Sequence, residues 1–367
     1  MAPSRPDPDP DPDPDPEPRP LSPAPAGDGG RADAGTMDTA AAHAARGDGG
    51  EAAPEPSAPL SDSAKAALFH EQRPRMLGLA YRMLGSAAEA EDAVQDAFLR
   101  WNAADASAVR VPAAWLTKVV TNLCLNRLTS ARATRESYIG PWLPEPVLID
   151  DGALGPMETA EQRDSVSVGV LVMLERLTPP ERAVFVLREA FGHTHREIAE
   201  LLDVEEDHSR QLLRRAREHV GAPQRRFAAD TAQQRRIVER FVAAAVEGDV
   251  GSLERMLAED VVAWTDGGGT VRAAPRPITG RAKVARFASV VGIRPEAAGL
   301  EAEVRAVNGE TAAILRVGGE LSGVMWLETA PDGRITAVRV VLPPGKLAFL
   351  AGQADPEGGE GETEPAG

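Results

Sequence analysis

The sequence predicts a multidomain protein with an all-α bundle, a helix-turn-helix unit and a C-terminal α+β domain, flanked by disordered tails. Three observations predict it. Helix-capping patterns and apolar residues at helical spacing recur between residues 61 and 220, whereas apolar residues alternate between turn signals after residue 257. Residues 1–60 and 351–367 have no apolar pattern that could bury a core. We expect ordered domains over 61–137, 166–224 and 228–350, with a linker over 138–165.

The tails also carry most of the charge. The formal net charge is −16, but acidic residues concentrate in an Asp-Pro repeat near the start and in residues 351–367, so the ordered middle is close to neutral. Nucleic-acid binding is therefore not excluded. No stretch is apolar and long enough for a signal peptide or a membrane span, and the single Cys124 excludes an internal disulfide. We expect a cytoplasmic protein with no membrane partner, metal or cofactor; Met37 is an alternative start.

Three helices are predicted in the first ordered domain. The first covers 64–84 and ends at Gly85; the second follows a capping box formed by Ser86 and Glu89; the third begins at Pro112. The outward face of the second helix is acidic, whereas the third carries Trp115 and several cationic side chains. This asymmetry favours one protein partner and one nucleic-acid partner, although a solvated charged face is the alternative.

A helix-turn-helix is predicted over 178–220. Capping boxes start helices at Pro179 and just after Thr194, and the tight connection at Asp203 leads into a third helix over 205–218. That helix places Leu212, Leu213 and Ala216 inward and Arg and Gln outward, as a helix that reads the major groove requires. A helical hairpin whose arginines are only solvated is the alternative.

The linker contains the run Trp142-Leu143-Pro144-Glu145-Pro146. Proline pre-orders an extended segment and Trp142 is a large anchor, so we expect this run to dock on a surface.

The C-terminal domain is predicted to begin with a helix over 232–247 and a second that starts at Asp249 or Ser252. Alternating segments then follow, with turns at Asn308-Gly309 and Asp332-Gly333, which indicates an antiparallel sheet.

The segments AEDAVQDAFLRW and PAAWLTKVVTNLCLNRL, followed by the helix-turn-helix, resemble an extracytoplasmic-function sigma factor, a promoter-specificity subunit of RNA polymerase. The resemblance implies core-polymerase contacts at Asp92, Gln95, Asp96 and Phe98. It implies contacts with the minus-ten promoter element at Trp115, Lys118, Asn122, Asn126 and Arg127, although Trp115 could equally be a core residue. Contacts with the minus-thirty-five element are expected at His208, Ser209, Arg210, Gln211, Arg214 and Arg215.

The Trp-Leu-Pro-Glu-Pro run resembles a marker of the SigJ-like subgroup, which carries an extra C-terminal SnoaL-like domain of α+β fold. The resemblance implies a regulatory intramolecular contact between this domain and the sigma domains. It would involve Trp142, Leu143, Pro144, Glu145, Pro146, Asp266, Gly267, Gly268, Gly269, Lys346 and Leu347; a flexible hairpin tip is the alternative for the glycines.

The sequence therefore favours a sigma factor that is not an enzyme, binds core RNA polymerase and promoter DNA, and is modulated by its C-terminal domain. The alternative is a ligand-binding or enzymatic SnoaL-like protein with an accessory DNA-binding module, because that fold hosts both enzymes and binders. An unknown small-molecule ligand is possible in either case.

Overall fold

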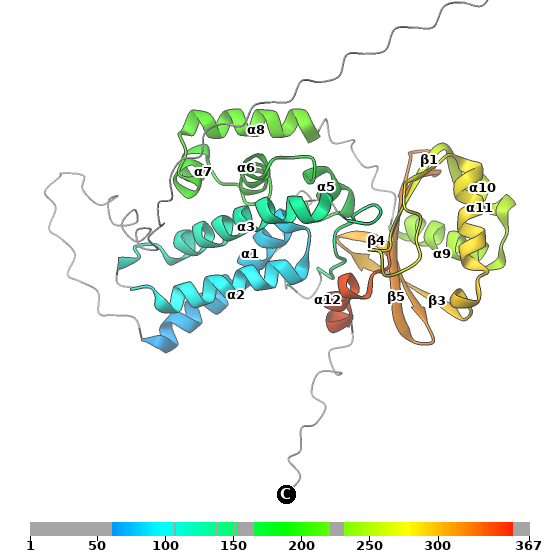
Figure 1. Cartoon of the computed structure of the whole chain (residues 1–367), viewed down its shortest axis with the longest axis horizontal. Helices are drawn as coiled ribbons and strands as arrows, with labels where there is room; N and C mark the ends of the chain where they lie inside the picture. The colour runs from blue at the N-terminus through cyan, green and yellow to red at the C-terminus, as the bar shows by residue number, and fades with distance from the viewer. Residues whose placement is uncertain are drawn as a thin grey trace, which may run out of the picture. The chain divides into compact units, whose positions relative to one another are not determined.

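The computed structural model describes residues 61–105, 108–136, 138–149, 152, 154, 165–220 and 231–354. All of them belong to one compact unit of the chain. The expected tail over 1–60, most of the acidic linker and residues 355–367 lie outside the described residues. Figure 1 shows helices in the first part of the chain and a sheet with helices in the last.

The first three helices are α1 (Asp62–Leu84), α2 (Ala87–Ala103) and α3 (Pro112–Glu136). Ser61 caps α1 by accepting from Ala64 N, and Gly85 ends it in the left-handed conformation at φ 68°. Ser86 caps α2 by accepting from Glu89 N at 3.1 Å. These boundaries agree with the sequence prediction to within two residues at the start of α1.

Four further helices form the helix-turn-helix region: α5 (Val168–Leu174), α6 (Pro179–Glu189), α7 (His195–Leu202) and α8 (Glu206–Val220). The two capping boxes predicted in this region are present, at Thr178 with Glu181 and at Thr194 with Glu197, whereas at α2 only the Ser86 half of the predicted box is formed. Asp203 adopts the left-handed conformation (φ 53°) and makes the tight turn before α8.

The two helical regions share one hydrophobic core. Met76 from α1, Leu116 from α3, Val184 from α6 and Leu213 from α8 belong to the same buried cluster. The regions that the sequence predicts at 61–137 and 166–224 therefore pack against each other through buried side chains.

The C-terminal domain begins with α9 (Thr231–Glu247) and α10 (Val250–Met256), which Asp249 caps through Ser252 N. The strands are β1 (Leu257–Asp266), β2 (Ile278–Thr279), β3 (Leu300–Val307), β4 (Glu310–Val317), β5 (Glu320–Thr329) and β6 (Ile335–Val341). They form one sheet in the order β2-β1-β6-β5-β4-β3. β1 runs parallel to β6, and the other neighbours are antiparallel.

Both faces of this sheet are covered. Phe241 from α9 and Val284 from α11 (Arg281–Gly292) pack with Met325 on one face, where Figure 1 also shows α10. Alternate residues face the other side, where Trp326 packs with Leu347 from α12 (Pro344–Ala354) and with apolar residues of the linker. The linker is therefore part of the C-terminal domain's second core.

Several elements were not predicted from the sequence: α5, α11, α12, the two-residue strand β2 and the short 3₁₀ turn Pro295–Ala297. The expected tail from residue 351 is also displaced, because α12 continues to Ala354 and Leu350 is fully buried.

Candidate functional site

Asp266, at the end of β1, is completely buried and fully hydrogen bonded. Oδ1 accepts from Tyr138 Oη at 2.6 Å and from Gly268 N at 3.1 Å. Oδ2 accepts from Leu143 N at 2.9 Å and from Lys346 Nζ at 2.7 Å. A buried carboxylate needs such partners, so Asp266 joins the glycine loop (residues 267–269), the linker and the start of α12.

Lys346 makes further contacts with the linker. Its Nζ also donates to the carbonyl oxygen of Leu143 at 2.6 Å. The ammonium lies 4.4 Å from the ring centre of Trp142 and 4.9 Å from that of Tyr138. Burial and the hydrogen bond to Asp266 raise the pKa of Tyr138. Five of the expected interface residues therefore come together: Trp142, Leu143, Asp266, Gly268 and Lys346.

The glycine loop approaches the linker closely. Gly268 and Gly269 have positive φ angles of 57° and 71°. A Cβ at Gly268 would lie 3.0 Å from Tyr138 Oη, and one at Gly269 would lie 3.0 Å from the side chain of Ile139. At Gly267 an added Cβ would lie 2.3 Å from the Val271 carbonyl oxygen. These distances support the expected close backbone approach.

Glu145 binds the N-terminal end of α2. Its carboxylate accepts from Ser86 Oγ at 2.7 Å, Ala87 N at 2.8 Å and Ala88 N at 3.2 Å. Burial raises the pKa of Glu145 although these hydrogen bonds oppose the shift. Trp142 covers Gly85, where an added Cβ would lie 2.7 Å from the indole ring. The remaining expected linker and α12 residues, Pro144, Pro146 and Leu347, are buried.

Sequence reasoning missed Asn308. It is buried in the β3–β4 turn with a left-handed φ of 55°. Its Nδ2 donates to Tyr81 Oη at 2.6 Å and to the Val166 carbonyl oxygen at 3.0 Å, and its Oδ1 accepts from Val147 N at 3.2 Å. The Asn-Gly pair identified the turn, but nothing in the sequence indicated its partners in α1 and the linker.

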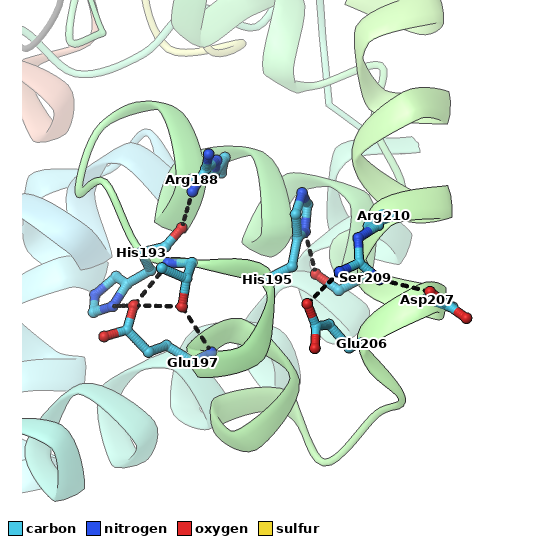
Figure 2. A network of polar contacts seen from close by, with 9 residues as sticks. Arg188, His193, His195, Glu197, Glu206, Asp207, Ser209 and Arg210 are labelled. Carbon is cyan, nitrogen blue, oxygen red and sulfur yellow. Dashed lines mark hydrogen bonds and ion pairs between the residues drawn. The ribbon is translucent and has the colours of Figure 1, made fainter.

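The expected promoter-reading face of α8 is only partly as predicted. His208, Arg210 and Gln211 are exposed, as are Arg214 and Arg215. Ser209 is the exception, because it is completely buried and hydrogen bonds with His195 Nδ1 at 3.0 Å (Figure 2). Ser209 stands three and four residues before Leu212 and Leu213, so its helical phase places it in the apolar stripe. This spacing was the missed signal.

Acidic residues accompany the α8 arginines. Arg210 donates to Asp207 Oδ1 at 2.6 Å and to Glu206 in the first turn of the helix, as Figure 2 shows. Arg215 Nε lies 3.8 Å from the capping Glu181, and Arg214 Nε lies 3.8 Å from Glu218. The Arg214 side chain is 75% exposed and is the most accessible of these three arginines.

The expected polymerase and minus-ten surfaces touch each other. Arg127 on α3 lies 2.7 Å from Asp96 and 3.8 Å from Asp92, both on α2. Asp92 and Gln95 are exposed. Phe98, by contrast, is half-buried and packs on the Phe69 ring at a centroid distance of 4.8 Å, which gives it a role in the core.

The other expected minus-ten residues lie along α3. Lys118 Nζ is 2.7 Å from Asp203 Oδ1 and donates to the Glu200 carbonyl oxygen at 3.0 Å, so it is tied to the C-terminal end of α7. Trp115 is half-buried against the core, with its ring 5.6 Å from that of Trp101. Asn122 is half-buried and Asn126 is exposed.

In the part of the chain that the structure describes, no group of three His, Cys, Asp or Glu residues is arranged to hold a metal ion. No helix of that part is both long and apolar enough to cross a membrane. Cys124 is a buried free thiol whose pKa is raised by burial.

Comparison with known proteins places the bundle and the helix-turn-helix in a transcription initiation factor. Residues 68–134 match Sigma-70 region 2, and residues 168–220 match Sigma-70, region 4. The chain is 36% identical over 296 residues to the ECF RNA polymerase sigma factor SigJ of Mycobacterium tuberculosis, covering 79% of this chain and 91% of that protein. It therefore belongs to the extracytoplasmic-function sigma factors.

Two further comparisons agree. The probable ECF RNA polymerase sigma factor SigI of Mycobacterium tuberculosis is 30% identical over 287 residues, covering 77% of this chain and 94% of that protein. The crystal structure of Mycobacterium tuberculosis SigJ aligns with a TM-score of 0.58 at 31% identity, covering 77% of this chain and 98% of that chain. The C-terminal α+β domain is therefore part of what this chain shares with SigJ.

Proposed function

We propose that this sigma factor is held in a closed state by its own C-terminal domain, and that it must open to engage core RNA polymerase and promoter DNA. The observation that carries this proposal is the contact of Asp266 and Lys346 with Leu143 of the linker. Because the same linker binds the start of α2 through Glu145, a change at the C-terminal domain is transmitted directly to the first sigma region.

The expected partner surfaces support a closed state. Lys118, a candidate for promoter contact, binds Asp203 at the turn of the helix-turn-helix. Arg127 binds Asp96, a candidate for polymerase contact. Promoter DNA would have to replace the ion pair of Lys118, and polymerase would have to replace that of Asp96. Ion pairs at a protein surface stabilise by only about 0–1 kcal/mol. The shared core of the two helical regions adds a larger barrier to separation.

We propose that the C-terminal domain regulates and does not catalyse. Asp266 is occupied by four donors and is unavailable as a general base. Two other carboxylates of the domain, Asp260 and Glu320, are exposed. The place of action is the cytoplasm, where polymerase and promoter DNA meet.

Run-off transcription with core RNA polymerase tests the closed state. We expect Lys346→Gln and Asp266→Asn to increase specific transcript relative to the unmodified chain, because each weakens the contact with the linker. Lys283→Gln is the matched control, since Lys283 is an exposed lysine of the same domain. Unchanged output from both interface variants, with both proteins folded, would show that the contact does not regulate.

These point variants are preferable to a chain ending at Gln224. Truncation would expose Leu143 and Leu148, which pack in the same buried cluster as Trp326 of the sheet. A defect of the truncated chain could then come from the exposed apolar surface.

A further inference from the structure

The C-terminal domain contains an apolar cavity of about 140 Å³ between its helices and its sheet. Phe241 from α9, Val284 from α11 and Met325 from β5 form part of its wall. This is the sheet face opposite the linker, so the cavity is separate from the interface around Asp266.

The cavity reaches the surface beside the connection between β1 and β2. Arg272 lines it and is exposed, and Val291 lines it with 37% of its surface exposed. A mouth with an apolar side and a cationic side admits an amphipathic molecule.

Only two lining residues carry a polar side chain, Thr265 and Arg272. The Thr265 hydroxyl oxygen accepts from Ala274 N at 2.9 Å, so its own proton remains to donate. Within the described residues Arg272 forms no ion pair. A guanidinium binds a carboxylate through two parallel hydrogen bonds, and both polar groups therefore favour an anionic acceptor.

The volume limits the occupant to a small molecule. An engineered, enclosed apolar cavity of about 150 Å³ in another protein binds benzene, so a single ring fits a space of this size. We propose that this cavity binds a small carboxylic acid with a ring-sized apolar body, which lies between α9, α11 and the sheet with its carboxylate at Arg272. This site goes beyond the proposed closed state and does not depend on it.

The position of the cavity gives the occupant a route to the interface. Thr265 precedes Asp266, and Leu342, another lining residue, donates its N–H to the Asp266 carbonyl oxygen at 3.0 Å. An occupant therefore packs against the same strand ends that present the inter-domain contact.

Isothermal titration of the full chain with benzoate tests the proposal. We expect saturable binding at one site, with benzoate about twofold to fivefold tighter than benzyl alcohol because the ion pair at Arg272 is solvent-exposed. Benzylamine, whose charge is repelled, should bind more weakly than either. Absence of saturable binding by all three probes overturns the site.

Two variants locate the binding. Ala288 lines the cavity on α11 and is half-buried, so Ala288→Leu fills the space and should weaken benzoate at least about tenfold. Arg272→Gln should remove the preference for benzoate over benzyl alcohol while leaving the alcohol's affinity unchanged. Arg276→Gln, an exposed arginine in the same connection, is the control and should change neither.

The two variants distinguish binding in this cavity from binding elsewhere on the chain. Benzoate binding that Ala288→Leu leaves unchanged, in a variant that melts as the wild type does, would place the ligand elsewhere. If that variant does not fold, Arg272→Gln decides alone: equal preference for benzoate in the variant and wild type contradicts the proposed anionic class and its position.

Discussion

Tyr81 Oη accepts a hydrogen bond from Asn308 Nδ2 at 2.6 Å and donates one to the Glu145 carbonyl oxygen at 2.6 Å. Tyr81 belongs to α1, Glu145 to the linker and Asn308 to the β3–β4 turn. All three are buried, so one phenol joins the first sigma region, the linker and the C-terminal domain. Loss of either bond leaves a desolvated polar group without its partner.

Asn308→Ala should therefore lower the free energy of unfolding by about 2–4 kcal/mol, because Val147 N–H and the Val166 carbonyl also lose their partner. Urea denaturation of the full chain measures the change. Asn308→Gly is the control for backbone strain, since glycine tolerates the left-handed conformation and lacks the amide. An Asn308→Gly variant as stable as the wild type would mean that the amide bonds contribute nothing.

The two tyrosines of the chain should not ionise near pH 10 while the protein is folded. Burial is the main cause that raises the pKa of both Tyr81 and Tyr138. The unfolded chain loses these protons first as the pH rises past about 10. The contribution of these two tyrosines to the free energy of unfolding is therefore fully present below about pH 10 and is lost as the pH rises further. Phenolate absorbance and unfolding should follow one transition, and a separate phenolate step in folded protein would contradict this.

Local signals made the helical part predictable. The capping boxes at Thr178 and Thr194 depend on residues three positions apart, so sequence alone located the starts of α6 and α7. Helical periodicity is another local signal: Ser209 lies three and four residues before the buried Leu212 and Leu213, which predicts a buried position for it. Long-range pairings are different: nothing local relates Lys118 to Asp203 or Tyr81 to Asn308, because only packing brings them together.

The C-terminal domain also contains a helix that could not be predicted from the sequence. The resemblance indicated Asp266 and Lys346 as interface residues, and the structure places them 2.7 Å apart. The resemblance gave no reason to expect α12, because Gly345 is a poor helix former, although Pro344 is well placed at the first helical position. Burial of Leu347 and Leu350 against the sheet stabilises this helix and outweighs that local preference.

The acidic face of α2 should bind core polymerase. Asp92→Asn combined with Gln95→Ala should weaken association at least about threefold, since both side chains are exposed and the first change removes a charge complementary to a basic partner. Co-purification with tagged polymerase measures it. Arg127→Gln is informative as a control, because it releases Asp96 and should leave association intact or stronger. Weaker association of this variant would place Arg127 itself at the polymerase contact.

The exposed arginines of α8 should bind phosphates. Arg214→Ala with Arg215→Ala should reduce promoter affinity of the holoenzyme and lower the slope of log affinity against log salt by about 1 for each phosphate that is no longer neutralised. Fluorescence anisotropy at several salt concentrations gives both values. Arg240→Ala, an exposed arginine of α9, is the matched control. An unchanged salt slope would exclude these side chains as phosphate ligands.

The ion pair of Lys118 with Asp203 should limit access to the minus-ten surface. Asp203→Asn removes the charge and retains a residue type that tolerates the left-handed turn. Since exposed ion pairs contribute about 0.2–1 kcal/mol, promoter binding by the holoenzyme should increase about twofold to fivefold. Asp260→Asn, at an exposed carboxylate of the C-terminal domain, is the control. In a Lys118→Met background the effect of Asp203→Asn should vanish, because the restrained cation is gone; an increase that persists there would come from reduced repulsion between Asp203 and DNA.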